Sequence, residues 1–341
     1  MMPFMALFLN ACSSVHYLYQ AGRGQLALMN RGKPIEQVIA DPTTDPRLAR
    51  LLSRIADIRS FCVESGLRET PNYREYVKLD RDAVVYVVTV SEPLEFKVKI
   101  FSFPIAGSFN YIGWFGKDDA VEFGRRFREE GKDVDIRGAS AYSTLGWFKD
   151  PLLSTMIPTE DGIIQEDAFA ELVNVVIHES VHATHYLNHQ SYFNESLAVF
   201  VADELTRRYF ESRNLTHSSE WKSYLSQDEI QRKRRGRLLK AYDELSALYS
   251  SPISDSEKRE KKEKYLEALR REVGFKRPIN NATLIQVKTY HDGDHGFPEL
   301  FKASGSDVRG FLKRLATLQS DDFSEDQAEV FNVVELLQQR K

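Results

Sequence analysis

The chain has 341 residues, of which 42% are hydrophobic and 28% charged, which is the composition of an ordinary soluble globular protein. Its net charge of −4 provides no general attraction to nucleic acid, so no nucleic-acid partner is expected. The only cysteines are Cys12 and Cys62, which excludes a disulfide framework and a metal site of paired cysteines.

The first eleven residues are almost wholly apolar and run directly into Ala11-Cys12-Ser13-Ser14. This junction resembles the end of a bacterial lipoprotein signal, in which the cysteine is lipidated and becomes the first residue. We therefore expect residues 1–12 to be a signal segment and Cys12 to carry a lipid anchor to the membrane. The alternative is a short buried segment with an unmodified cysteine.

Residues 13–80 are expected to be helical, because Leu48, Leu51, Leu52, Ile55 and Ile58 recur at helical spacing. Residues 81–150 change to β-branched and aromatic runs, which predict a sheet-rich part with one inserted helix. The expected strands are 83–90, 96–101, 109–115, 134–137 and 141–148, and the expected helix is 117–131.

From residue 161 the pattern is helical almost to the end, with helices predicted over 166–187 and 194–213. Residues 220–273 read as a charged helical hairpin broken near residues 250–255. We predict one α+β domain over residues 13–341, in which a small, mainly antiparallel sheet is followed by a helical catalytic half. Its metal-binding helices lie within 161–215, and residues 216–341 form a helical C-terminal part.

The segment His178-Glu179-Ser180-Val181-His182 lies inside the predicted helix 166–187 and follows an apolar run. Residues four apart on a helix share a face, so the two imidazoles can bind one ion. Glu179 can then reach a water held by the same metal. The alternative is a helix with two partly buried histidines that bond to backbone or carboxylate.

A catalytic zinc takes three protein ligands and keeps one open position, and Glu195 on the next helix is the candidate for the third. Asn194 is expected to cap that helix, which would place Glu195 in its first turn. The alternative role for Glu195 is a carboxylate favoured by the helix N-terminus. His185 and His189 are the competing third ligands.

These residues together resemble the predicted bacterial aminopeptidase family of zincin type, many of whose members look like lipoproteins. The resemblance covers most of the chain and rests on a set of short segments. They are Ala11-Cys12-Ser13-Ser14, 103–107 with Tyr111, Gly113 and Phe115, 141–148, 150–155, 178–182, 193–196, Asn280-Asn281-Ala282 and Tyr290.

The resemblance implies a zincin-like fold and metal-dependent peptide hydrolysis at the bacterial cell envelope, facing the periplasm or the outside. One zinc ion per chain, held by His178, His182 and Glu195, would activate a water, with Glu179 as the general base. Tyr290 recurs in the family pattern and is the candidate donor to the oxyanion, with His291 and His295 as weaker candidates. Asp203 is a candidate to orient a ligand imidazole.

Residues 141–148 are a candidate edge strand for pairing with substrate backbone, which makes Tyr142 and Ser143 the expected substrate-binding residues. The alternative is an ordinary strand with a buried tryptophan.

A peptide substrate is expected, but the sequence is compatible with more than one function. The Gly-x-Met-x-Asn segment that holds the substrate amine in the best-known zinc aminopeptidases is absent. An endopeptidase, a hydrolase of peptidoglycan stem peptides and a non-catalytic lipoprotein that uses the fold for binding are therefore the alternatives. The presence of Glu179, which the chemistry requires and folding does not, favours an enzyme.

Overall fold

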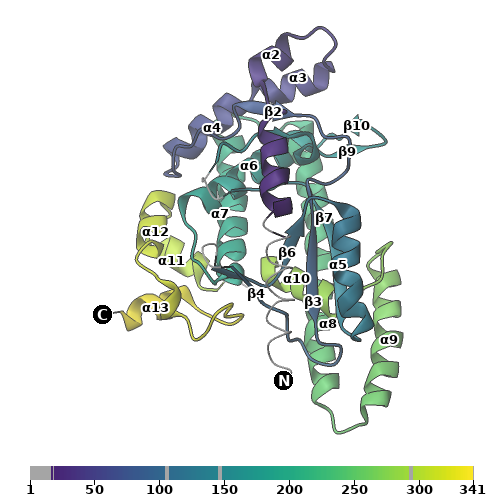
Figure 1. Ribbon diagram of the computed structural model, residues 1–341. Coiled ribbons are helices and arrows are strands. Elements are labelled where there is room, and N and C mark those ends of the chain that lie inside the picture. The colour runs from purple at the N-terminus through teal and green to yellow at the C-terminus, as the bar shows by residue number, and fades with distance from the viewer. Residues whose placement is uncertain (1–16, 18, 104–106, 145–147, 292–294, 341) are drawn as a thin grey trace.

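The structure, a computed structural model, describes residues 17, 19–103, 107–144, 148–291 and 295–340 (Figure 1). It is a mixed α+β fold, as predicted, with residues 19–29 helical ahead of the elements named below. The helices are α2 (Ile35–Ala40), α3 (Pro46–Ser53), α4 (Ile55–Glu64), α5 (Lys117–Glu129), α6 (Ala168–Thr184), α7 (Ser191–Ser212), α8 (Ser219–Ser250), α9 (Asp255–Glu272), α10 (Asn281–His291), α11 (Phe297–Ala303), α12 (Val308–Leu315) and α13 (Val333–Gln339). Cys12 and residues 145–147 of the predicted edge strand lie outside the described residues.

Among the residues that the structure describes, the strands form four small sheets rather than one. They are β1 (Lys33–Pro34), β2 (Glu75–Val77), β3 (Val85–Ser91), β4 (Phe101–Phe103), β5 (Gly107–Phe109), β6 (Ile112–Trp114), β7 (Asp133–Ala139), β8 (Leu152–Leu153), β9 (Thr159–Glu160) and β10 (Ile163–Ile164). The pairing is mainly antiparallel, as expected, and the exception is the parallel pair of β2 and β8.

The largest sheet has the order β6-β3-β7, with β3 in the centre and antiparallel to both neighbours. Helix α5 packs on one face of this sheet and α10 on the other, so β3 is buried on both sides (Figure 1). A strand covered on both faces reads as a continuous β-branched run, which explains why residues 83–90 were recognisable in the sequence.

Two of the expected strands are wrong. Residues 96–100 form only one isolated bridge, between Val98 and Ser91, because Phe96 and Val98 pack against the α8–α9 hairpin instead of a strand. The ring of Phe96 stacks on Tyr242 with centroids 3.7 Å apart, so the alternation of residues 96–101 reflects burial against helices. Residues 140–144 also carry no strand, since β7 ends at Ala139.

Three alternate residues of β7 point to the same face and fasten α10, with neighbouring residues, to the sheet through polar contacts. We call these contacts the β7–α10 seam. Asp133 accepts hydrogen bonds from the Lys262 ammonium at 2.5 Å and from the Asn281 backbone amide at 2.8 Å. Asp135 pairs with Arg277 and accepts from Thr283. Arg137 donates from Nε to Gln286 Oε1 at 3.1 Å. The seam fixes α10, whose last turn carries Tyr290.

Helices α6 and α7 form an antiparallel pair at the centre of the molecule (Figure 1). Residues Leu172, Val173, Val176, Ile177 and Val181 of α6 are fully buried in the main hydrophobic core. Because this face of α6 is fixed by packing, the neighbouring face holds its polar side chains in defined positions. No helix in the described part of the chain has the length and apolar character needed to cross a membrane.

Candidate metal centre

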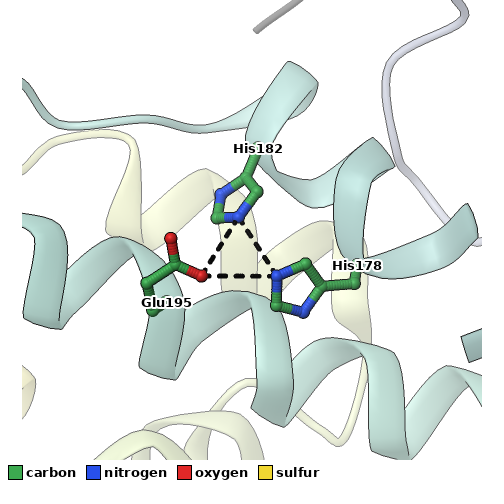
Figure 2. A group of neighbouring side chains, drawn as sticks. All are labelled: His178, His182 and Glu195. Carbon is green, nitrogen blue, oxygen red and sulfur yellow. Dashed lines mark hydrogen bonds and ion pairs between the residues drawn. The ribbon is translucent and has the colours of Figure 1, made fainter. Parts of the chain in front are cut away.

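His178 and His182 lie one turn apart on α6, and their imidazoles converge (Figure 2). The two Nε2 atoms are 3.2 Å apart, and the rings lie at 85° to each other. Glu195 on α7 completes a triangle, because its Oε2 atom lies 3.4 Å from Nε2 of His178 and 3.5 Å from Nε2 of His182. The structure thus brings together the three predicted ligands.

The dimensions of this triangle fit a bound metal ion. Zinc–ligand bonds of about 2.0–2.1 Å in a tetrahedron separate the ligand atoms by about 3.3–3.4 Å, close to the observed edges. Glu195 Oε2 is buried and has no hydrogen-bond partner among the described residues. Such an atom is costly to leave unsatisfied in a protein interior, and a cation between the three groups would satisfy it. A donor set of two imidazoles and one carboxylate is one that zinc accepts.

Glu195 is fixed by the turn that joins α6 to α7. The expectation that Asn194 caps α7 is wrong, because α7 already begins at Ser191. The Asn194 side chain instead accepts a hydrogen bond from the Leu187 backbone amide at 2.9 Å and donates to the Leu187 carbonyl at 2.7 Å. This double contact closes the turn and so orients Glu195, the next residue along α7.

The protonation state of Glu195 suits a ligand. Burial by itself would raise the pKa of this carboxyl, but the charges of His182 and His178, whose Nε2 atoms lie 3.5 Å and 3.4 Å from Oε2, hold the pKa below its usual range. The other oxygen, Oε1, accepts a hydrogen bond from the Tyr111 hydroxyl at 2.9 Å. The two oxygens therefore have separate roles, one toward a phenol and one toward the imidazoles.

Glu179 follows the first histidine and lies beside the triangle. Burial raises the pKa of its carboxyl to about 7, and the negative charges of Glu195 and Asp150 add to this effect while His178 opposes it. A carboxyl with a pKa near neutrality can both accept and release a proton under ordinary conditions.

Three tyrosines are within the electrostatic influence of Glu195. Burial raises the pKa of Tyr111, Tyr186 and Tyr290, and the Glu195 charge raises each of them further. All three hydroxyls therefore stay protonated and can donate hydrogen bonds. Tyr290, the expected catalytic donor, is within the electrostatic influence of both Glu195 and Glu179.

Arg137 and Asp150 are polar neighbours of the triangle that the sequence did not single out for a role. The guanidinium of Arg137 lies over the Tyr290 ring, 5.1 Å from its centroid, and its positive charge lowers the pKa of Tyr290 against the larger effect of burial. Asp150 is buried and accepts hydrogen bonds from Asn72 and from the backbone and side chain of Thr144. No motif could reveal these positions, because both depend on how the sheet docks against the helices.

The expected substrate-binding residues lie on the Asp150 side. Tyr142 is half-buried, packs edge-on against Phe115 and is within the electrostatic influence of Asp150. Ser143 precedes Thr144, which is hydrogen-bonded to Asp150. Since residues 140–144 form no strand, the edge-strand mode of binding has no support in the described part of this segment.

The remaining candidate histidines do not join the triangle. His185 is at the end of α6 and packs against Phe193, and burial lowers its pKa to about 4. His295 stacks on Phe331 with ring centroids 4.0 Å apart, which is a packing role. His291 is within the electrostatic influence of the metal centre. Burial lowers its pKa to about 3, and the charges of Arg235, His178 and Arg137 act in the same direction.

His189 belongs to a separate cluster with Ser108 and Asp326. Its Nδ1 atom lies 3.0 Å from Ser108 Oγ and 3.2 Å from Asp326 Oδ2. A serine relay needs the acid and the serine on different ring nitrogens, so this arrangement is not a serine relay. It ties the α6–α7 turn to β5 and to the C-terminal segment.

Asp203, the candidate for orienting an imidazole, accepts a hydrogen bond from Asn174 at 3.1 Å. Its carboxyl is within the electrostatic influence of His178, although no contact between the two is observed among the described residues.

A cavity of about 290 Å³ lies away from the metal centre, between α9 and the start of α10. Its lining includes Arg259, Lys262 and Asn280. Because Tyr290 is at the other end of α10, this cavity does not belong to the His178–His182–Glu195 site.

A family model described as “Putative aminopeptidase” matches residues 16–330 of the chain. Neither the curated proteins nor the solved structures contain a match to the chain.

Proposed function

Since the chain belongs to the “Putative aminopeptidase” family, we propose that it is a zincin-like metallopeptidase that trims the N-terminus of peptides with one zinc ion. The observation that carries this proposal is the triangle of His178, His182 and Glu195, whose edges have the spacing of zinc ligands. When bound, zinc supplies Lewis acidity that lowers the pKa of water and polarises a carbonyl group.

Glu179 is the general base of the proposed reaction. It accepts the proton of the water that attacks the scissile carbonyl and then delivers this proton to the leaving amine. Its raised pKa supports both steps, because neither protonation state is strongly favoured near neutral pH. Its position next to His178 on α6 keeps the carboxyl beside the ligand triangle.

Tyr290 is the proposed donor to the carbonyl oxygen on which negative charge develops. A phenol with a raised pKa keeps its proton through the reaction, so it stabilises this charge as a fixed donor. The β7–α10 seam holds the helix that carries Tyr290, and the guanidinium of Arg137 covers one face of its ring. The position of the Tyr290 hydroxyl is thus set before the substrate binds.

We also propose that the protein is anchored in the bacterial cell envelope through lipidated Cys12 and faces the periplasm or the outside. The support is the apolar segment that ends in Ala11-Cys12-Ser13-Ser14. Incorporation of labelled palmitate into the protein in bacterial cells, and its loss in Cys12→Ser, tests the anchor. Equal labelling of both proteins would reject it.

The peptidase proposal is tested by elemental analysis of the zinc-loaded protein, together with digestion of a mixed peptide library. We expect about one zinc per chain and products that differ from their parents by the N-terminal residue. Cuts within peptides would replace N-terminal trimming by endopeptidase action. A failure to bind zinc after loading, or zinc binding without any cleavage, would contradict a zinc peptidase.

A further inference from the structure

We propose that Arg137 forms a subsite for a carboxylate group on the residue that leaves when the peptide bond is cut. This inference rests on the proposed peptidase function and assigns a class of substrate to it. The ligand is either the C-terminal carboxylate of a dipeptide or an acidic side chain at the same position, since both present two oxygens to a guanidinium.

The first observation is the charge balance of the β7–α10 seam. Asp133 meets Lys262 and Asp135 meets Arg277, so two of the three contacts pair a carboxylate with a cation. At the third contact Arg137 donates to the neutral amide of Gln286. No carboxylate lies within ion-pair distance of Arg137 among the described residues. In the described part of the chain, the positive charge at this end of the seam is therefore not paired with a carboxylate.

The second observation is the way in which Arg137 is held. Its Nε atom donates to the buried side chain of Gln286, and its guanidinium lies over the ring of Tyr290. A guanidinium has five N–H donors, and the contacts to Gln286 and Tyr290 leave enough of them to bind both oxygens of a carboxylate. The side chain is half-buried, so its free donors are oriented and only partly solvated.

The third observation is position. The guanidinium of Arg137 lies 5.1 Å from the centroid of the Tyr290 ring, and the charges of Glu195 and Glu179 also act on the Tyr290 hydroxyl. In a dipeptide the terminal carboxylate is three bonds from the scissile carbonyl carbon, which is within about 4 Å. A substrate with its scissile carbonyl at Tyr290 would therefore place this carboxylate near the phenol whose ring Arg137 covers.

The neighbouring cation does not offer the same site. Arg235 also acts electrostatically on His291, but its guanidinium is paired with Asp228 at 3.1 Å. Glu179 is within the electrostatic influence of the buried carboxyl of Asp150, which would repel a second negative group. Arg137 is thus the group on this side of the site that attracts an anion.

The test compares kcat/KM for alanyl-phenylalanine, its C-terminal amide and alanyl-aspartate amide, in the wild-type protein and in Arg137→Gln. We expect alanyl-phenylalanine to exceed its amide by roughly 10–100-fold in the wild type, as for a charge-assisted pair. In Arg137→Gln this ratio should fall below about 3-fold. Alanyl-aspartate amide distinguishes a C-terminal carboxylate from an acidic side chain as the ligand. If it is hydrolysed faster than alanyl-phenylalanine amide, the subsite also accepts acidic side chains.

The acid-to-amide ratio is measured within each protein, so it does not depend on how much of a variant is folded. Arg277→Gln is the matched control, because it weakens the same seam at Asp135 without altering Arg137. This control should keep the wild-type ratio. Arg137→Lys, which retains the charge without the planar fork, should give an intermediate ratio. A wild-type ratio near 1 together with no preference for alanyl-aspartate amide over the phenylalanine amide, or preferences that are equal in wild type and Arg137→Gln, would overturn the subsite.

A binding measurement separates the subsite from the proposed function. Calorimetric titration of Glu179→Gln with alanyl-phenylalanine and with its amide reports recognition without turnover. If the wild type cuts no peptide but Glu179→Gln binds the acid more tightly than the amide, the subsite stands and the peptidase proposal fails. If peptides are cut but acid and amide bind equally, the peptidase proposal stands and the subsite fails.

Discussion

The Tyr111 hydroxyl donates a hydrogen bond to Oε1 of Glu195 at 2.9 Å, while Oε2 of the same carboxylate faces the two histidines. The phenol comes from the turn between β5 and β6 and the carboxylate from α7, so this contact links the sheet region to the ligand helices. A carboxylate held through one oxygen presents the other in a fixed direction, which is how neighbouring groups orient metal ligands.

We predict that Tyr111→Phe lowers zinc affinity by about 10–100-fold without preventing folding, because Glu195 loses the donor that orients it. Competition with a chromophoric chelator measures the change. Tyr249→Phe is the matched control, since it removes the hydroxyl that donates to Asn281 at 2.7 Å, outside the metal site. Equal affinity in Tyr111→Phe and wild type would remove Tyr111 from the metal centre.

Glu195→Gln should lower the zinc content from about one per chain to a small fraction after dialysis, because the carboxylate supplies one of three protein ligands. Elemental analysis gives the stoichiometry. Glu204→Gln changes a carboxylate on the same helix that pairs with Arg207 and Arg208, and it should retain the zinc. Full zinc content in Glu195→Gln would show that another group completes the site.

Glu179→Gln should retain zinc while kcat/KM for peptides falls by about 10²–10⁴-fold, the usual contribution of a general base. Zinc content and activity are measured on the same preparation, so that loss of the metal is distinguished from loss of the base. Activity within a few-fold of the wild type would assign proton transfer to another group.

Glu171 should make stability depend on pH. Burial raises the pKa of this carboxyl from 4.5 to about 7, and Asp167, Asp228 and Asp203 add to the shift. Below pH 4.5 the carboxyl is neutral in both the folded and the unfolded protein, so its burial does not lower the free energy of unfolding. Between pH 4.5 and 7 the unfolded chain ionises first, so the free energy of unfolding falls as pH rises, and the cost is complete above pH 7.

Glu171→Gln removes this titration, so we expect it to stabilise the protein by about 2 kcal/mol at pH 8 and by little at pH 4.5. Urea unfolding at both pH values measures the difference. The exposed Glu299→Gln is the control and should show no such dependence. Equal effects of Glu171→Gln at the two pH values would mean that Glu171 ionises normally in the folded protein.

Asn194→Ala should lower the free energy of unfolding by about 2–4 kcal/mol, because it leaves both the amide and the carbonyl of Leu187 without a partner. Urea unfolding measures the loss. The exposed Asn30→Ala is the comparison and should change stability little. A loss below about 1 kcal/mol would mean that water or another group replaces the side chain.

The helices that carry the metal ligands could be predicted because the sequence patterns that indicate them lie within short segments. His178 and His182 share a face whenever residues 178–182 are helical, and the apolar run before them marks that helix. Glu195 follows from the short turn between two helices. The role of Tyr111 could not be predicted, because a single tyrosine in a turn between strands carries no pattern. Its distance to Glu195 depends on the docking of two distant segments.

The errors have a common physical origin. Alternation in residues 96–101 predicts a strand, but burial of every second residue also arises when an extended segment lies along helices, as Phe96 does on Tyr242. The sequence predicts a cap at Asn194 because capping is a common role of asparagine before an acidic residue. In the structure, Asn194 lies inside α7, and its side-chain amide both accepts from and donates to the backbone of Leu187.

The order in which the chain is made has a consequence for the β7–α10 seam. The three ligands come from one helical hairpin and can gather as soon as α6 and α7 have been synthesised. Tyr290 comes from a helix that is made much later and is fixed only when it docks on β7. We expect a nascent chain to be able to capture its ion well before the rest of the site is in place. Docking of α10 would then be the last step that completes the site, so that an unfinished chain does not cleave neighbouring peptides.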